Sequence, residues 1–135
     1  MPGRDLASPA DLLPLLRDFY ERAFADELLG HVFVDVVAMD LEEHLPAIAA
    51  FWQRVLFGTG EYTGRPLAQH RAVHARVELS SAHFTRWLAL WRASLDASFT
   101  GPVTERAYQH AERTANGFER NLSVDEPARS LPLLR

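Results

Sequence analysis

The chain has 135 residues, of which 47% are hydrophobic and 24% are charged, so it is long enough to form one domain with its own core. The net charge of -4 and the lack of a basic stripe argue against a nucleic-acid partner, and the absence of cysteine excludes disulfides and thiolate metal sites. No apolar run approaches the roughly 20 residues of a membrane span. The first residues also lack the apolar region of a signal peptide, so we expect a cytoplasmic protein without a membrane contact.

The first expected helix follows residues 1–7, which we expect to be a loose leader. Residues 8–11 read Ser-Pro-Ala-Asp, which is a typical helix start because the serine can cap, the proline suits the first turn and the carboxylate lies three residues after the cap. Pro14 predicts a kink or a restart, and Gly30 predicts a left-handed end. One buried face is expected from Leu12, Leu13, Leu16, Phe19, Tyr20, Ala23 and Phe24.

Residues 31–39 are short, apolar and rich in valine. Propensity alone favours a strand, but the chain offers no convincing strand partner and a lone strand leaves its backbone groups unpaired. We therefore interpret the segment as a connecting corner or helical turn whose Phe33 points inward. Residues 40–43 then form a capping box for a helix that Gly58 ends, while Pro46 predicts an irregular first turn or a later start.

The second half of the chain predicts further helices. Residues 62–66 have turn chemistry, and residues 67–77 can hold a short helix. A strong helix begins after Ser80 or Ser81 and carries an aromatic face as far as Phe99. After the break at Gly101, a last helix runs to about Leu122 and is followed by a frayed tail. The fold class is therefore all-α, with about five helices.

The histidines raise the question of a metal site. His70 and His74 are four residues apart, so they share one face of a helix and can form a zinc pair. The zinc-protease signature requires a glutamate directly after the first histidine, where this chain has Arg71. A third ligand would have to come from another part of the chain. We expect His31, His83 and His110 to be ordinary surface or hydrogen-bonded residues.

Haem is the other metal group that the sequence allows. A haem site needs a histidine ligand and large apolar side chains that keep water from the macrocycle, and aromatic residues are abundant here. Aromatic residues at helical spacing can equally form an ordinary core. Tyr20 and Trp87 favour the haem hypothesis, because each places a polar group on an apolar helix face, and both can donate to one buried acceptor.

An ordered set of motifs resembles the truncated haemoglobins, specifically their third group. The motifs are Phe19-Tyr20, residues 30–33, His44-Leu45, Phe51-Trp52, Tyr62-x-Gly64-x-Pro66-Leu67-x-x-His70 and His83-Phe84-x-x-Trp87-Leu88. They cover roughly residues 12–122. The resemblance implies an all-α truncated globin fold, a two-over-two helical sandwich around haem b. It implies a single domain over 1–135, with the core at about 8–122.

The resemblance also implies roles for individual residues. His70 matches the proximal iron ligand, with His74 as its rival, because the step of 26 residues from His44 to His70 fits the family. Tyr20, His44 and Trp87 match the distal side, where His44 is the candidate gate. Pro46 and the short link from Phe33 to His44 depart from the pattern. The implied cofactor-binding set is Phe33, His44, Ile48, Phe51, Trp52, Tyr62, His70, His74 and Trp87.

The function that the resemblance implies is the binding of O2, NO or CO at a pentacoordinate iron. The resemblance is also compatible with NO dioxygenation or peroxidase-like chemistry at this iron. Turnover with NO would need a reductase partner, because the chain contains no flavin or nicotinamide fingerprint. Two alternatives remain open, namely a non-haem metal protein that uses His70 and His74, and a helical interaction module without a ligand.

Overall fold

The structure, a computed structural model, describes residues 3–36, 38–62, 72, 74 and 79–124. Helices dominate this part of the chain, and its one β-type feature is an isolated bridge between Arg4 and Phe99. In chain order the elements are η1 (Pro9–Asp11), α1 (Leu12–Ala25), α2 (Glu27–Gly30), η2 (His31–Val36), α3 (Leu41–Phe57), α5 (Ser81–Ser98) and α6 (Pro102–Val124).

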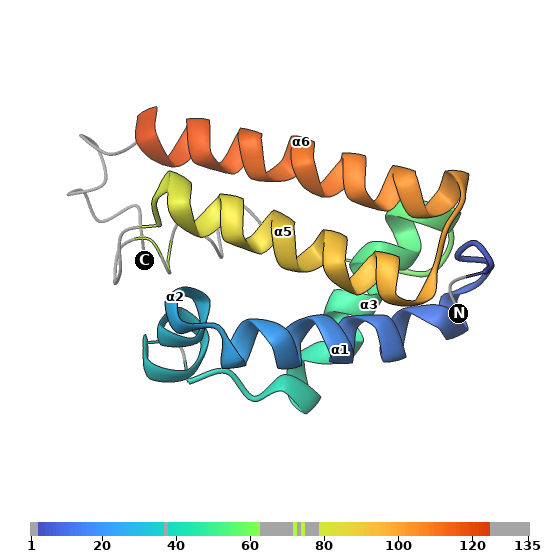
Figure 1. The fold of residues 1–135 in the computed structure, drawn as a ribbon, viewed down its shortest axis with the longest axis horizontal. Coiled ribbons are helices and arrows are strands. Elements are labelled where there is room, and N and C mark those ends of the chain that lie inside the picture. The colour runs from blue at the N-terminus through green and yellow to red at the C-terminus, as the bar shows by residue number, and fades with distance from the viewer. Residues whose placement is uncertain (1–2, 37, 63–71, 73, 75–78, 125–135) are drawn as a thin grey trace.

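The helices form two layers. In Figure 1, α5 and α6 lie side by side and run in opposite directions above α1, and α3 crosses behind. Helix α1 packs on α3 within its layer and on α5 across the interface, while α5 packs along α6. The all-α, two-over-two arrangement predicted from the sequence is confirmed.

The core lies where α1, α3 and α5 meet. Small residues allow α6 to approach closely, because Ala107, Ala111 and Ala115 repeat at four-residue spacing and are at most 2% exposed. Trp91 anchors this contact, since its Nε1 donates to the Ala107 carbonyl oxygen at 3.2 Å. The residues of α1, α3 and α5 in the core are Leu12, Leu15, Leu16, Phe19, Leu45, Trp52, Leu56, Trp91 and Leu95.

The predicted helix signals act mostly as expected. The Asp40 side chain caps α3 by accepting from the Glu43 N–H at 3.3 Å, and Ser80 is the cap of α5. Gly58 ends α3 in the left-handed conformation at φ 68°. Helix α3 nevertheless begins at Leu41 in spite of Pro46, whose missing N–H removes only one internal hydrogen bond.

The local prediction for Gly30 is wrong. Gly30 does not end a helix in the left-handed region; it is helical, and a π-helical turn, His31–Val36, continues directly from it. A Cβ at Gly30 would lie 2.5 Å from the Phe24 carbonyl oxygen, so this glycine permits a close backbone approach. The helical interpretation of residues 31–36 is thereby confirmed over the strand.

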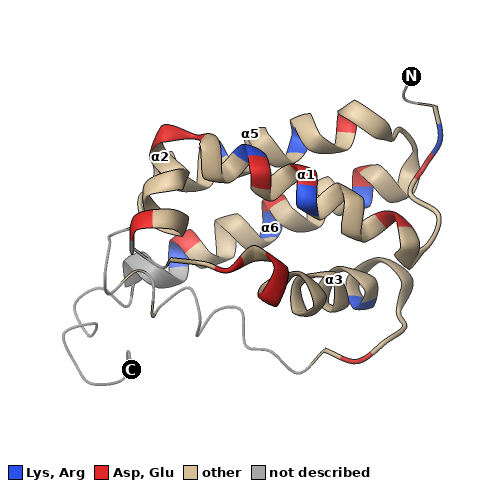
Figure 2. Cartoon of the chain, turned by 90° about the horizontal axis from the view of Figure 1, so that it is seen from below, with Lys and Arg blue, Asp and Glu red and all other residues tan. Residues whose placement is uncertain are grey.

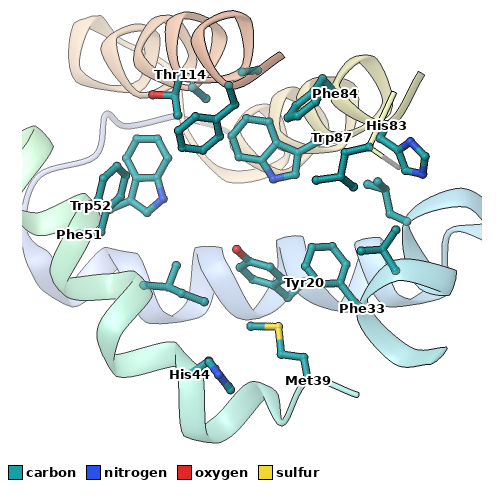
Figure 3. A pocket seen from close by; sticks show the side chains of 17 residues that line it. Tyr20, Phe33, Met39, His44, Phe51, Trp52, His83, Phe84, Trp87 and Thr114 are labelled. Carbon is teal, nitrogen blue, oxygen red and sulfur yellow. The ribbon is translucent and has the colours of Figure 1, made fainter. Parts of the chain in front are cut away.

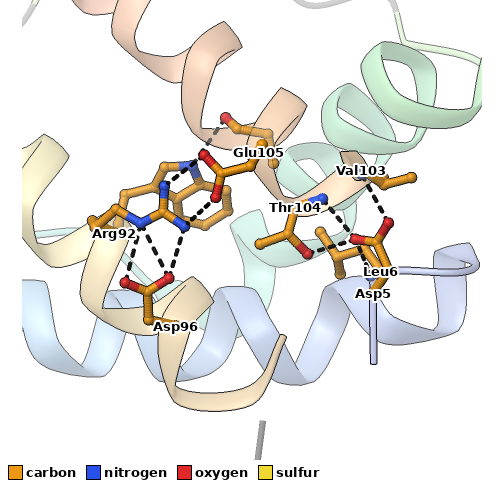
Figure 4. A network of polar contacts seen from close by, with 9 residues as sticks. Asp5, Leu6, Arg92, Asp96, Val103, Thr104 and Glu105 are labelled. Carbon is orange, nitrogen blue, oxygen red and sulfur yellow. Dashed lines mark hydrogen bonds and ion pairs between the residues drawn. The ribbon is translucent and has the colours of Figure 1, made fainter. Parts of the chain in front are cut away.

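The described part of the leader, residues 3–7, is also not loose. Leu6 is 1% exposed, and the Asp5 carboxylate accepts from the Val103 N–H at 2.8 Å and from the Thr104 N–H at 2.8 Å (Figure 4). Arg4 forms an ion pair with Asp11 at 2.6 Å. Residues 4–7 are thus fastened to the start of α6 and to η1.

Several predictions lie outside the described residues. They are the turn after Tyr62, most of the short helix at 67–77, the ligand candidate His70 and the tail after residue 124. Among the helices that are described, none is both long and apolar enough to cross a membrane.

Candidate functional site

A cavity of about 390 Å³ lies between the two layers. Its size is in the range of small-molecule and cofactor sites, and aromatic and aliphatic side chains form most of its wall (Figure 3). Elements α1, η2, α3, α5 and α6 all contribute to it. Its apolar lining residues are Leu29, Val32, Phe33, Met39, Ile48, Phe51, Trp52, Leu79, Phe84, Trp87, Ala111, Ala115 and Phe118.

Tyr20 places a hydroxyl at the cavity from a half-buried ring. Figure 3 shows the hydroxyl directed into the open space from α1. The ring is held edge-on by Phe19 at 4.8 Å and by Phe33 at 5.7 Å between centroids. Burial raises the pKa of Tyr20 well above its ordinary value, and within the described part of the chain no hydrogen bond offsets that burial. A neutral donor therefore faces the cavity.

Trp87 lies across the cavity from Tyr20. It comes from α5 and packs edge-on against Phe19, with the ring centroids 6.2 Å apart. Figure 3 shows its indole nitrogen on the side that faces Tyr20. An indole nitrogen can only donate, so the two side chains offer donors to the same space.

His44 lines the cavity from α3 while remaining exposed. Its Nδ1 lies 2.8 Å from the Asp40 carbonyl oxygen, which can only accept. The neutral ring therefore carries its proton on Nδ1 and leaves a lone pair on Nε2. Glu42 and Glu43 flank His44, and Figure 2 shows this acidic cluster at the start of α3.

The remaining predicted wall residues divide into two groups. Phe33, Ile48, Phe51 and Trp52 line the cavity. Tyr62 does not line it, but packs behind it against Phe51 at 5.3 Å between centroids.

Of the two candidate iron ligands, the structure describes only His74. His74 is 4% exposed and does not line the cavity, and its Nδ1 accepts a hydrogen bond from the Leu79 N–H at 2.8 Å. His70 lies outside the described residues. Among the residues that are described, no three metal-ligating side chains converge.

His83 lines the cavity although the sequence suggested an ordinary histidine. Its Nδ1 accepts from the Ser80 N–H at 2.9 Å, so His83 takes the N3 position of a capping box whose N-cap is Ser80. Burial, and then the proximity of His31, lowers the pKa of His83. The sequence did contain a signal that His83 lies at the cavity, namely its position in the first turn of the helix, one residue before Phe84 on the apolar face.

Met39 and Thr114 also line the cavity and were missed. Met39 gave no sequence signal, because its position depends on Ala38, which has a positive φ of 54°. Thr114 lies next to the buried Ala115 on α6, but a single threonine on a helix gives no sequence signal for a cavity.

No family model matches the chain. The group 3 truncated haemoglobin Ctb of Campylobacter jejuni is 30% identical over 111 residues, which cover 80% of this chain and 85% of that protein. The crystal structure of the group III truncated haemoglobin from Campylobacter jejuni superposes with a TM-score of 0.79 and 26% identity, over 90% of this chain and 95% of that chain.

Two pairs of helices around an aromatic-lined cavity define a globin of the shortened type. The chain belongs to the truncated haemoglobin family, in its third group. Globins hold haem, so this membership implies a haem-binding role for the chain.

Proposed function

We propose that the cavity binds one haem b whose iron takes O2, NO or CO, with His70 as the protein ligand and Tyr20 and Trp87 on the opposite face. One observation carries this proposal, namely the Tyr20 hydroxyl, which faces the apolar cavity and makes no hydrogen bond within the described part of the chain. A group that fills the cavity would bury this hydroxyl, and a buried hydroxyl without an acceptor costs free energy, so a ligand that accepts from it is favoured.

The cavity fits haem by its chemistry. Phe33, Phe51, Trp52 and Phe84 supply flat apolar contacts, which exclude water from a macrocycle. When bound, haem supplies an iron with one free coordination position for a diatomic ligand.

The chain's own donors set the residence time of the ligand. Tyr20 and Trp87 both donate into one water-poor space, and a buried hydrogen bond contributes roughly 0.5–1.5 kcal/mol. Two such bonds slow ligand release on the order of tenfold to a hundredfold, because about 1.4 kcal/mol corresponds to a factor of ten. Slow release suits sensing or chemistry better than delivery.

The hydrogen bond of His74 favours His70 as the iron ligand. A nitrogen that binds a metal needs a free lone pair, and the other ring nitrogen then donates its proton. In His74 the Nδ1 accepts from Leu79 instead, so the proton of the neutral ring is on Nε2. His74 would have to break this hydrogen bond and exchange tautomers before it could bind iron through Nε2.

The charge around His44 favours neutral ligands. Asp40, Glu42 and Glu43 precede His44 at the start of α3. Arg17 pairs with Glu42 at 2.9 Å, so Asp40 and Glu43 leave a net negative charge there, which lowers the local concentration of anions. O2, NO and CO carry no charge and are unaffected. We therefore expect nitrite or other anions to enter more slowly than a diatomic gas, with a difference that shrinks at high salt.

A spectroscopic comparison tests the cofactor and its ligand. The purified protein should show a Soret band at about one haem per chain, with a shift on reduction with dithionite and addition of CO. His70→Ala should lose or loosen the haem, and His74→Ala should retain it. Loss of haem in His74→Ala alone would show that the ligand assignment is wrong.

A stopped-flow measurement tests the distal donor. Tyr20→Phe removes one hydroxyl and should speed O2 release from the ferrous protein on the order of tenfold, the value of one hydrogen bond. Tyr108→Phe is the matched control, because Tyr108 packs under the Arg92 guanidinium rather than at the cavity. An unchanged release rate in Tyr20→Phe would show that Tyr20 does not hold the ligand.

A further inference from the structure

Two indole rings connect the wall of the cavity to the buried core. Trp52 lines the cavity and is 5% exposed, whereas Trp91 is 1% exposed and does not line it. The rings stack with centroids 4.9 Å apart and planes 26° apart. We call these two residues the indole pair. Aromatic packing explains the stability that this contact contributes. It does not explain why further aromatic rings extend from Trp52 toward the surface.

The contacts beyond Trp52 follow the cavity wall to Phe51 and leave the cavity at Tyr62. Phe51 contacts Trp52 at 5.4 Å and Tyr62 at 5.3 Å between centroids, so an unbroken row of rings runs from Trp91 to Tyr62. Tyr62 is only partly buried. This burial raises the pKa of its phenol, but the phenol can still pass its proton to solvent when the ring is oxidised. Indole and phenol are the two side-chain rings that give up one electron most readily, and they occupy the inner part and the outer end of this row.

We propose that the indole pair is a one-electron donor site for the loaded cavity and that Tyr62 is its outlet at the surface, used when a hydroperoxide is reduced in the pocket. This inference rests on the proposed haem binding. A hydroperoxide that takes up two electrons and two protons yields an alcohol and water. A haem held in the cavity would supply one electron, the indole pair would supply the other, and solvent would supply the two protons.

The other oxidisable rings at the cavity are poorer donors. Oxidation of a tyrosine is favourable when the phenol proton can leave, and Tyr20 has no acceptor for it within the described chain while burial raises its pKa. Trp87 has an edge-on contact with Phe19 at 6.2 Å rather than a stacked indole. A stacked pair spreads a positive charge over two rings, so the electron vacancy is more stable on Trp52 and Trp91.

The protons of Trp91 and Tyr62 determine the direction of electron transfer between them. Trp91 Nε1 donates to the Ala107 carbonyl oxygen, which is no base, so an oxidised Trp91 keeps its proton and remains a cation. Such a cation readily takes an electron back. Tyr62 can supply it through Phe51, losing its electron to the indole pair and its proton to water, which leaves a neutral phenoxyl radical at the surface.

Tyr108 provides a matched control within the chain. The Arg92 guanidinium lies 4.8 Å above its ring, and a fixed positive charge opposes the removal of an electron from that ring. The structure therefore distinguishes two partly buried tyrosines, of which Tyr62 should be oxidised and Tyr108 should not.

The test treats the ferric haem-loaded protein with one equivalent of hydrogen peroxide, followed by rapid-freeze electron paramagnetic resonance and peptide mass spectrometry. Protein with ring-deuterated tryptophan distinguishes an indole radical from a phenoxyl radical. We expect an early tryptophan signal, a later tyrosine signal, and oxidised products at Trp52, Trp91 and Tyr62. Trp91→Phe should lose the tryptophan signal, Tyr62→Phe should prolong it, and Tyr108→Phe should match the parent.

The outcomes separate the two proposals. Protein without a Soret band contradicts the proposed function itself. Haem-loaded protein whose radical and products lie on Tyr20 or Trp87, or whose tryptophan signal survives in Trp91→Phe, overturns the indole-pair proposal alone. If Trp91→Phe fails to fold, Tyr62→Phe tests the proposal instead. An unchanged lifetime of the tryptophan signal and unchanged oxidation products in Tyr62→Phe would show that Tyr62 does not reduce the indole pair through Phe51.

Discussion

At the scale of single residues, the wall of the cavity depends on one unusual backbone angle. Ala38 has φ 54°, a region that residues with a Cβ rarely adopt, and the Met39 N–H donates to the Phe33 carbonyl oxygen at 2.8 Å. This turn brings Met39 into the cavity below Tyr20 (Figure 3). Alanine gives no sequence signal for a left-handed conformation, so neither the turn nor Met39 was predictable.

Ala38→Gly should therefore stabilise the protein. Glycine adopts the left-handed region without the clash of a Cβ, and removing that clash stabilises the folded state by about 1–2 kcal/mol. The greater freedom of glycine in the unfolded chain opposes this by about 0.4–1 kcal/mol. We expect a net increase of roughly 0.5–1 kcal/mol in the free energy of unfolding, measured with urea. Ala93→Gly, at an exposed position inside α5, is the control and should lose about 1 kcal/mol. Equal losses in both variants would show that Ala38 is not strained.

At the scale of elements, the sequence predicted the contacts that lie close together in the chain. The caps at Asp40 and Ser80 belong to motifs of four residues, so their signals are local. Asp5 instead accepts from Val103 and Thr104, which are 98 and 99 positions away. No local pattern identifies such a partner, which is why residues 4–7 were expected to be loose and are not.

Asp5→Asn should weaken the start of α6. The carboxylate accepts from the Val103 N–H through one oxygen and from the Thr104 N–H and hydroxyl through the other. An amide keeps only one acceptor oxygen, so we expect Asp5→Asn to cost about 0.5–1.5 kcal/mol. Burial alone raises the pKa of Asp5, but the hydrogen bonds from Thr104, Val103 and Leu6 outweigh it and lower the pKa. Glu112→Gln, an exposed change on the same helix, is the control.

The direction of that pKa shift fixes the pH dependence of the Asp5 variant. A depressed folded-state pKa contributes stability above the unfolded value of about 3.9, and this stability is lost as the pH falls through the folded value. The difference in unfolding free energy between the parent and Asp5→Asn should hence be full at pH 6 and shrink below about pH 4. A difference that stays constant down to pH 3 would contradict the carboxylate as its source.

At the scale of the whole molecule, periodicity predicted the helices but not the cavity between them. Trp52 and Trp91 both occupy apolar helix faces and look alike in the sequence, yet only Trp52 reaches the cavity, and Trp91 packs behind it. His83 and Tyr62 show the same limit, since one lines the cavity and the other lies behind Phe51. Which ring borders an open space depends on how two layers meet, and no single helix encodes that.

The same cavity predicts that haem is part of the stability of the fold. Side chains around a space of about 390 Å³ lose packing contacts when nothing fills it, and a group that binds only the folded chain adds free energy by mass action, about 2.7 kcal/mol at a hundredfold excess over Kd. Protein stripped of haem should unfold at a lower temperature than the reconstituted protein, by calorimetry. His70→Ala should show a much smaller rise on addition of haem, whereas His74→Ala should show the parent's rise. A stripped protein as stable as the reconstituted one would mean that the two layers pack fully without a ligand, as an interaction module would.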